Sequence, residues 1–237
     1  MFMMEQTLKV TNVFSDPTRF NIYQFLLEHQ DEPVTVLNVA EEFDIHPNVA
    51  RLHLSKLEEI NMVTSHFERT GKGGRPSKLY LLSDNVIELN FPHRDYKMLS
   101  SIAIETLVNL GNVGIQALYD TGKKYGQQII EKSTQNVSSL TDLTIDQKIA
   151  LLEDAATMLG MYPQFHYDEQ TKSITFHINN CPFKEVTAHN QSMVCHMHHS
   201  FIKGMFNELF TDIELIELEN MFDGCANCKY VAKLSIV

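Results

Sequence analysis

The four cysteines of this 237-residue chain lie together near its C-terminal end. They are Cys181, Cys195, Cys225 and Cys228, and none precedes residue 181. Thiolates are the ligands that zinc and iron–sulfur clusters prefer. The CxxC pair, residues 225–228, lies on an expected tight turn between two strands, and His198 follows Cys195 by one helical turn. The sequence therefore predicts a metal site made by the four cysteines, with His198 as an additional candidate ligand.

The cellular compartment of a protein affects whether its cysteines form disulfides, bind metal or take part in redox chemistry. The first ten residues mix Glu5 and Lys9 with apolar residues, unlike a signal peptide, and no apolar run approaches the roughly 20 residues of a membrane helix. We therefore expect a cytoplasmic protein without membrane contact. Thiols stay reduced there, so clustered cysteines favour metal or redox chemistry over structural disulfides. Two other interpretations are a redox dithiol at Cys225 and Cys228 and four unrelated, buried apolar thiols.

The first 83 residues carry the signals of a DNA-binding domain. Helix starts are predicted at Asp16-Pro17, at Thr35 and at His46-Pro47. Two short apolar runs, 63–67 and 79–82, flank a glycine-rich tip in which four basic residues and no acidic one lie between Arg69 and Lys78. Helix, helix, turn, helix and hairpin is the order of a winged helix–turn–helix.

The third helix and the hairpin tip supply the candidate DNA contacts. If Ala50, Leu54 and Leu57 face the core, the polar residues of that helix face outward. Asparagine can pair with adenine and arginine with guanine, whereas serine and lysine suit phosphate. The predicted DNA-binding residues are Asn48, Arg51, Ser55, Lys56, Lys72, Arg75 and Lys78. Because the net charge is −11, DNA contact must be confined to small basic surfaces.

The remaining chain is predicted as a connector with a dimerisation helix, residues 84–138, followed by a sensor domain, residues 139–237. The stretch 98–132 is too apolar for one solvated helix, although Gly111 and Gly114 argue against an unbroken rod. It can pair two subunits or pack within its own chain. A helix at 144–159 and strands near 163–167, 173–178, 213–218 and 229–236 complete an α+β fold.

Several of these segments resemble a known family. Asp16-Pro-Thr-Arg19, residues 49–63 and Gly74-Arg-Pro76 resemble the ArsR-like winged-helix regulators. Asn180-Cys-Pro-Phe183, Val194-Cys-His-Met-His198 and the late cysteines resemble the narrower branch of SufR-type iron–sulfur-dependent repressors. That resemblance implies a homodimeric repressor whose operator affinity depends on an iron–sulfur cluster. Family members use three cysteines, whereas this chain has four, a set that also suits a closed zinc site.

The sequence thus predicts a DNA-binding transcriptional regulator, a repressor rather than an enzyme. Its expected partners are a second copy of the chain and a double-stranded operator with an inverted repeat. Its expected cofactor is an iron–sulfur cluster, with zinc as the alternative. Two other classes stay open. One is a winged-helix regulator that responds to a small organic effector and holds a structural zinc. The other is a thiol oxidoreductase fused to a DNA-binding module, although no glycine-rich nucleotide loop is found.

Overall fold

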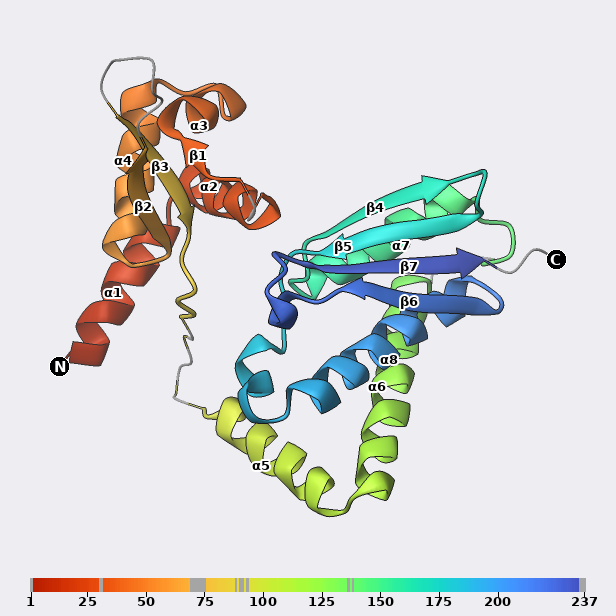
Figure 1. The fold of residues 1–237 in the computed structure, drawn as a ribbon. Coiled ribbons are helices and arrows are strands. Elements are labelled where there is room, and N and C mark those ends of the chain that lie inside the picture. The colour runs from red at the N-terminus through yellow and green to blue at the C-terminus, as the bar shows by residue number, and fades with distance from the viewer. Residues whose placement is uncertain are drawn as a thin grey trace. The chain divides into compact units, whose positions relative to one another are not determined.

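The computed structural model describes residues 2–29, 32–68, 76–87, 89, 92, 94–135, 137 and 139–234. The chain folds into two compact units, residues 1–94 and 95–237 (Figure 1). Each unit has its own hydrophobic core. Among the described residues, no helix is both long enough and apolar enough to span a membrane.

The first unit is a bundle of short helices beside a small antiparallel sheet. Its elements are α1 (Phe2–Phe14), α2 (Pro17–Glu28), β1 (Val34–Thr35), α3 (Val36–Glu42), α4 (Pro47–Glu59), β2 (Val63–Glu68) and β3 (Ser77–Leu82). The sheet order is β1-β3-β2. The predicted three helices and hairpin are therefore present, and α1 and β1 are additions that the sequence did not reveal.

Side-chain caps fix where these helices begin. The Arg19 N–H donates to Asp16 Oδ1 at 3.0 Å at the start of α2. Thr35 and Asn38 cap α3 reciprocally, the Asn38 N–H donating to Thr35 Oγ1 at 3.2 Å. Such caps satisfy N–H groups that have no partner inside the helix. The helix starts predicted from sequence are thus confirmed, and α3 and α4 follow each other with a tight turn between them.

The second unit is an α+β domain, which confirms the predicted fold class. Its elements are α5 (Tyr96–Asn109), α6 (Asn112–Ser133), α7 (Ile145–Met158), β4 (Pro163–Asp168), β5 (Ser173–Ile178), η1 (Lys184–His189), α8 (Gln191–Leu209), β6 (Ile213–Glu219), η2 (Met221–Asp223) and β7 (Cys228–Leu234). The strands form one antiparallel sheet in the order β4-β5-β7-β6. Residues of α7 and α8 join the inner face of this sheet in one core.

The two central strands show why this core forms. Every second side chain of β5 is buried, and so are Cys228, Tyr230 and Ala232 of β7, as a sheet covered on one face requires. Phe176 on β5 stacks on Tyr230 of β7, with ring centroids 5.2 Å apart, and on Phe206 of α8 at 5.3 Å. The sheet thereby fixes the position of α8, the helix that carries Cys195 and His198.

The apolar stretch at 98–132 forms two helices. Gly111, with φ +65°, separates α5 from α6. Helix α6 packs along α8 at glycines: a Cβ at Gly126 would overlap the carbonyl oxygen of Phe201, and a Cβ at Gly204 would overlap that of Lys123. Part of this stretch therefore packs within its own chain. Helix α5, in contrast, contains no buried residue.

Candidate functional site

The exposed side of α4 is the candidate DNA-reading surface. Ala50, Leu54 and Leu57 are fully buried in the core of the first unit, as the helical spacing predicts. Asn48, Arg51, Ser55 and Lys56 therefore lie on the remaining faces. Arg51 Nη1 donates to Asn48 Oδ1 at 2.9 Å, so the two base-reading candidates lie side by side.

Two apolar side chains lie on the same outward side of α4. Val49 is 41% exposed and Leu52 is 55% exposed. Leu52 is four residues after Asn48 and three before Ser55, so it lies between them on the helix surface. Apolar side chains in such positions can contact the C5-methyl group of thymine in the major groove. The surface therefore offers both polar and apolar readers of bases.

The predicted phosphate contacts have different surroundings. Lys56 forms an ion pair with Glu59 at 2.9 Å on the exposed helix surface. Lys78, on β3, forms an ion pair with Glu58 of α4 at 2.8 Å. The hydrogen bond to Glu58 raises the pKa of the Lys78 ammonium group. Lys78 thus ties the hairpin to α4, a role that the sequence did not suggest. Lys72 and Arg75 lie outside the described residues.

His53 supports the reading surface from inside. The ring is buried on the core side of α4, and burial lowers its pKa. Its charged neighbours are Asp16 and Arg19 of the α2 start. A neutral imidazole among buried side chains is best explained as a packing residue that joins α2 to α4.

The cysteines are brought together from three parts of the second unit. Cys181 follows β5, Cys195 lies on α8, and Cys228 begins β7, where it pairs in register with Ile178 of β5. Cys181 and Cys228 are buried, Cys195 is partly buried, and all four cysteines are free thiols. Cys195 and Cys228 both act electrostatically on Cys181. The long-range pairing of β5 with β7 therefore brings Cys228 to the end of the strand that precedes Cys181.

Cys225 has a different setting. It is partly buried on the turn after η2, preceded by Gly224 in the left-handed conformation with φ +90°. Only Gly adopts this conformation readily, so Gly224 lets the chain turn immediately before Cys225. The turn predicted for the CxxC pair is present.

His198 contacts Cys181, a residue from a distant segment, in addition to following Cys195 by one turn of α8. The distance from Cys181 Sγ to His198 Nδ1 is 3.7 Å. The imidazole is almost fully buried, with the ring of Phe183 against it at 5.1 Å between centroids. Its other nitrogen, Nε2, is buried without a hydrogen-bond partner. An unpartnered buried nitrogen is unusual and costs free energy.

Burial controls the charge state of these groups. It raises the pKa of the Cys181 thiol to about 12 and that of Cys228 to about 11. Burial also raises the pKa of Cys195 and lowers that of His198 to about 4. At neutral pH Cys181, Cys195 and Cys228 are therefore uncharged thiols and His198 is a neutral imidazole, unless a cation replaces the thiol protons.

An open cleft of about 400 Å³ gives solvent access to Cys195. Its lining comes from α8 and the end of β6: Gln191, Ser192, Cys195, His196, His199, Glu217 and Asn220. Glu217 is held in place, since Tyr230 Oη donates to Glu217 Oε2 at 3.0 Å and Asn220 Nδ2 donates to Oε1 at 3.1 Å. Its carboxylate acts electrostatically on Cys195 and Cys228.

The thiols suit a soft metal, although the site is not assembled. In the part of the chain that the structure describes, no three His, Cys, Asp or Glu side chains already form a group that could hold a metal ion. The Met221 N–H donates to Cys228 Sγ at 3.5 Å, so that thiol is engaged by the backbone. The donor types match zinc and iron–sulfur chemistry.

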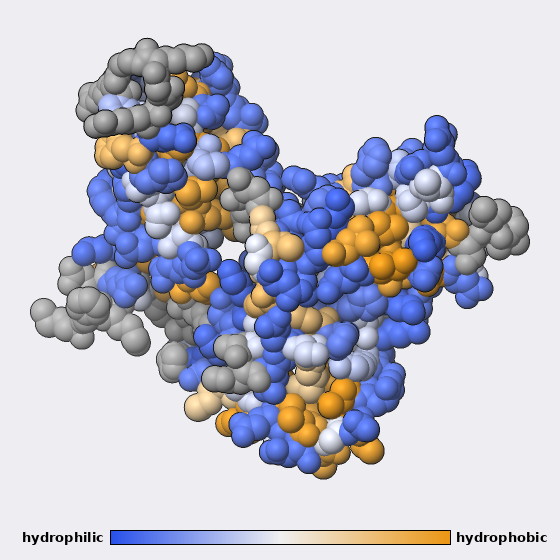
Figure 2. All heavy atoms as spheres, viewed as in Figure 1, coloured by the Kyte–Doolittle hydropathy of each residue, from blue (hydrophilic) through white to orange (hydrophobic). Residues whose placement is uncertain are grey.

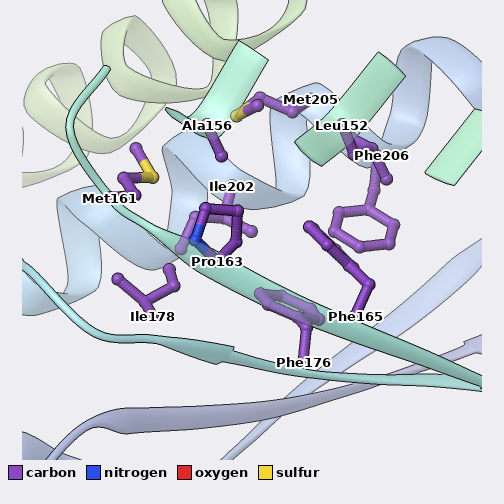
Figure 3. Close-up of a pocket in the computed structure, with 10 residues that line it drawn as sticks. All are labelled: Leu152, Ala156, Met161, Pro163, Phe165, Phe176, Ile178, Ile202, Met205 and Phe206. Atoms are coloured by element: carbon purple, nitrogen blue, oxygen red, sulfur yellow. The ribbon is translucent and has the colours of Figure 1, made fainter. Parts of the chain in front are cut away.

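A second cavity lies in the core between α7, α8 and the β4–β5 hairpin. Ten residues line it, among them Phe165, Phe176 and Phe206, which point into one apolar space (Figure 3). Its volume is about 10 Å³, about the least that one water molecule needs. An organic effector would not fit this cavity unless the surrounding side chains moved.

One comparison with known proteins bears on the first unit. A family model described as a helix-turn-helix domain matches residues 14–66. No curated protein sequence matches the chain. The helix–turn–helix match supports a DNA-binding regulator, and it leaves the narrower SufR-type branch undecided.

Among solved structures, the phenol-responsive sensory domain of the transcription activator PoxR, crystallised with phenol, is similar. It has 16% identity and a TM-score of 0.44, covering 78% of this chain and 89% of that one. A trafficking protein particle complex subunit 3 from Naegleria fowleri, covalently bound to palmitic acid, has 14% identity and a TM-score of 0.39, covering 59% and 97%. Neither likeness is close enough to indicate what this chain binds.

Proposed function

We propose that this protein is a transcriptional repressor whose operator affinity is controlled by a metal centre, an iron–sulfur cluster or zinc, at the C-terminal cysteines. One observation carries the DNA-binding part of the proposal. A complete helix–turn–helix with a paired hairpin leaves Asn48 and Arg51 together on the exposed side of α4. The resemblance to the SufR-type repressors supports the metal part.

The exposed α4 surface would read bases in the major groove. Arg51 would pair with guanine and Asn48 with adenine, while Ser55 and Lys56 would contact phosphate. Lys72 and Arg75 would supply further phosphate contacts at the tip of the hairpin. The ion pair between Lys78 and Glu58 would hold that hairpin against α4. These contacts are local, as an acidic protein requires.

The thiols of Cys181, Cys195 and Cys228 would hold the metal centre, and Cys225 is near enough in sequence to join them. A bound iron–sulfur cluster would make the protein sensitive to oxygen and to the availability of iron, whereas zinc would form a redox-inert link between the cysteines. The cysteines themselves connect β5, α8 and β7. Joining them would restrict how α8 moves relative to the sheet.

Helix α5 is the part that we propose pairs two subunits. Several of its large apolar side chains are more than half exposed: Tyr96, Met98, Leu99 and Ile102, followed by Leu110 and Val113 at the bend. Between residues 98 and 119 the sequence has one charged residue, Glu105. Figure 2 shows hydrophobic residues gathered at the α5–α6 bend. Such a patch marks an interface.

A second copy of the chain is the occupant that fits this surface. An inverted-repeat operator needs two recognition helices at a fixed spacing, which a two-fold dimer supplies. A 14-residue helix with no buried residue also gains little from its own chain and needs packing to be stable. Because α5 continues into α6, and α6 packs closely on α8, a change at the cysteines could reach the subunit interface.

The test begins with anaerobic purification of the full chain. Iron, sulfide and zinc are counted, and an operator is selected from random duplexes. Affinity for that operator is then measured with and without the bound metal. The proposal requires a metal centre, sequence-selective binding and a change in affinity when the metal is removed. If the protein bound the operator selectively and with the same affinity with and without the metal, the metal site would be structural and would not control DNA binding.

A further inference from the structure

We propose that Phe67, on the hairpin beside α4, packs against the deoxyribose groups of the DNA strand that borders the groove occupied by α4. This inference rests on the proposed function, because it names a further contact of the same DNA-binding surface. It starts from the exposure of the ring. Phe67 is 68% exposed, more than any other large apolar side chain that the structure describes in the first unit.

The register of the hairpin fixes the face of the sheet on which Phe67 lies. Phe67 pairs directly with Lys78 of β3, and paired residues place their side chains on the same face. Lys78 forms its ion pair with Glu58 of α4 and lies over the ring of buried Tyr80, 4.8 Å from the centroid. Ser65, two residues before Phe67 and so on the same face, donates a hydrogen bond to Glu58. Phe67 therefore lies on the face of the hairpin that turns toward α4.

The part of α4 to which the hairpin is attached also carries predicted DNA contacts. Glu58 is three residues after Ser55 and seven after Arg51, so the three side chains lie on one stripe of the helix. Single exposed apolar side chains are common on protein surfaces, so the position of Phe67 matters more than its exposure. The ring lies beside the stripe of Arg51 and Ser55, and α4 leaves it uncovered.

The width of the major groove selects the part of DNA that this ring meets. A helix with its side chains is about 10–12 Å across and the groove is about 12 Å wide, so α4 would fill it. A side chain beside the helix then meets the wall of the groove, which is made of sugar and phosphate. Phenylalanine has no charge or hydrogen-bond donor for phosphate, whereas deoxyribose offers apolar C–H groups. The sugar is therefore the group that Phe67 contacts.

A contact of this kind has a distinctive effect on binding. Phe67→Ser should weaken binding at least about tenfold, because it removes the burial of an aromatic ring. The loss should be equal for the selected operator and for random duplex, since sugar carries no sequence information. The salt dependence should stay unchanged, because no phosphate contact is lost. Phe67→Leu, which keeps an apolar side chain, should retain most of the affinity.

A tryptophan at this position reports the contact directly, because the chain contains no tryptophan. In the full-length Phe67→Trp variant, acrylamide should quench the fluorescence of the free protein and quench that of the operator complex much less. His66→Trp is the matched control. His66 is exposed and, as the neighbour of Phe67 on the strand, lies on the opposite face. Its quenching should be the same with and without operator.

Several results would overturn the inference. Equal quenching of Phe67→Trp in the free and bound protein would do so, as would a loss in Phe67→Ser that is confined to the operator or that changes the salt dependence. If Phe67→Ser fails to fold, the two tryptophan variants still decide. A wild-type protein that selects an operator while Phe67→Trp stays accessible in the complex would leave the proposed function standing. A wild-type protein that selects no operator would remove both.

Discussion

Replacing Gly126 by alanine should break the contact between α6 and α8. A Cβ at this position would overlap the Phe201 carbonyl oxygen and lie 2.9 Å from its carbonyl carbon and 3.1 Å from the Met205 nitrogen. Carbon atoms in good contact are about 3.5–4.0 Å apart. Because the obstacles are backbone atoms, rotating a side chain cannot relieve the overlap, and the two helices must separate.

The magnitude follows from two opposing effects. Alanine favours a helix over glycine by about 1 kcal/mol. Overpacking costs about 1–3 kcal/mol, and more where backbones must move, and a gap of about 0.5–1 Å along the helix contact forfeits a quarter to a half of each atom pair's attraction. An overpacking cost at the upper end of that range, less the helix gain, leads us to expect that Gly126→Ala lowers the free energy of unfolding by about 2 kcal/mol. For a unit of this size that corresponds to a fall in Tm of roughly 7 °C.

Gly122→Ala is the matched control on the same helix. A Cβ there would lie 3.1 Å from the carbonyl oxygen of Met197, a tight contact without overlap, and 3.1 Å and 3.2 Å from its Cγ and Sδ, which belong to a flexible side chain that can move. Its Tm should stay within a few degrees of wild type. Calorimetry of the full chain measures the Tm of unfolding. Hydrogen exchange of peptides from α8 shows whether the loss of stability lies at the contact between α6 and α8. Equal stability of Gly126→Ala and wild type, with unchanged exchange in α8, would refute the reasoning.

Three further predictions concern the DNA-binding unit and the dimer. Arg51→Ala should reduce the preference for the selected operator over random duplex by about 1–3 kcal/mol, measured by competition binding, and an unchanged preference would remove Arg51 from base reading. Ile102→Glu should make the protein monomeric in sedimentation and weaken operator binding. Met158→Glu, at a highly exposed site on α7, should leave the protein dimeric and its operator binding unchanged. If both variants stayed dimeric, α5 would be excluded as the interface. Burial lowers the pKa of His53, so the unfolded chain takes up a proton near pH 6.5 while the folded chain does not. Stability should therefore fall below about pH 6.5, and His53→Gln should show a smaller loss in urea unfolding at pH 5.5 relative to pH 7.5.

Local signals in the sequence were sufficient for much of the fold. Caps such as Asp16 and Thr144 mark helix starts because their side chains satisfy free N–H groups at the same place in the chain. Alternating burial in β5 follows directly from the period of a strand. The two-residue strand β1 could not be predicted in this way, because it is too short to show a period.

The site was only partly predictable, since its geometry depends on contacts between distant segments. Spacing along α8 connects Cys195 with His198, but the partner that His198 meets is Cys181, which follows β5. Cys228 comes near Cys181 through the register of β5 with β7, which no local pattern encodes. Likewise Lys78 was predicted as a DNA contact, and its ion pair with Glu58 arises from the packing of the hairpin on α4.

The most direct test of the proposed metal control is operator binding by the anaerobically purified protein before and after removal of its metal. We predict that iron or zinc co-purifies in a constant ratio to the chain. Affinity for the selected operator should change at least about tenfold on removal and return when the same metal is restored. A metal-free protein that binds the operator with the same affinity and selectivity would contradict metal control.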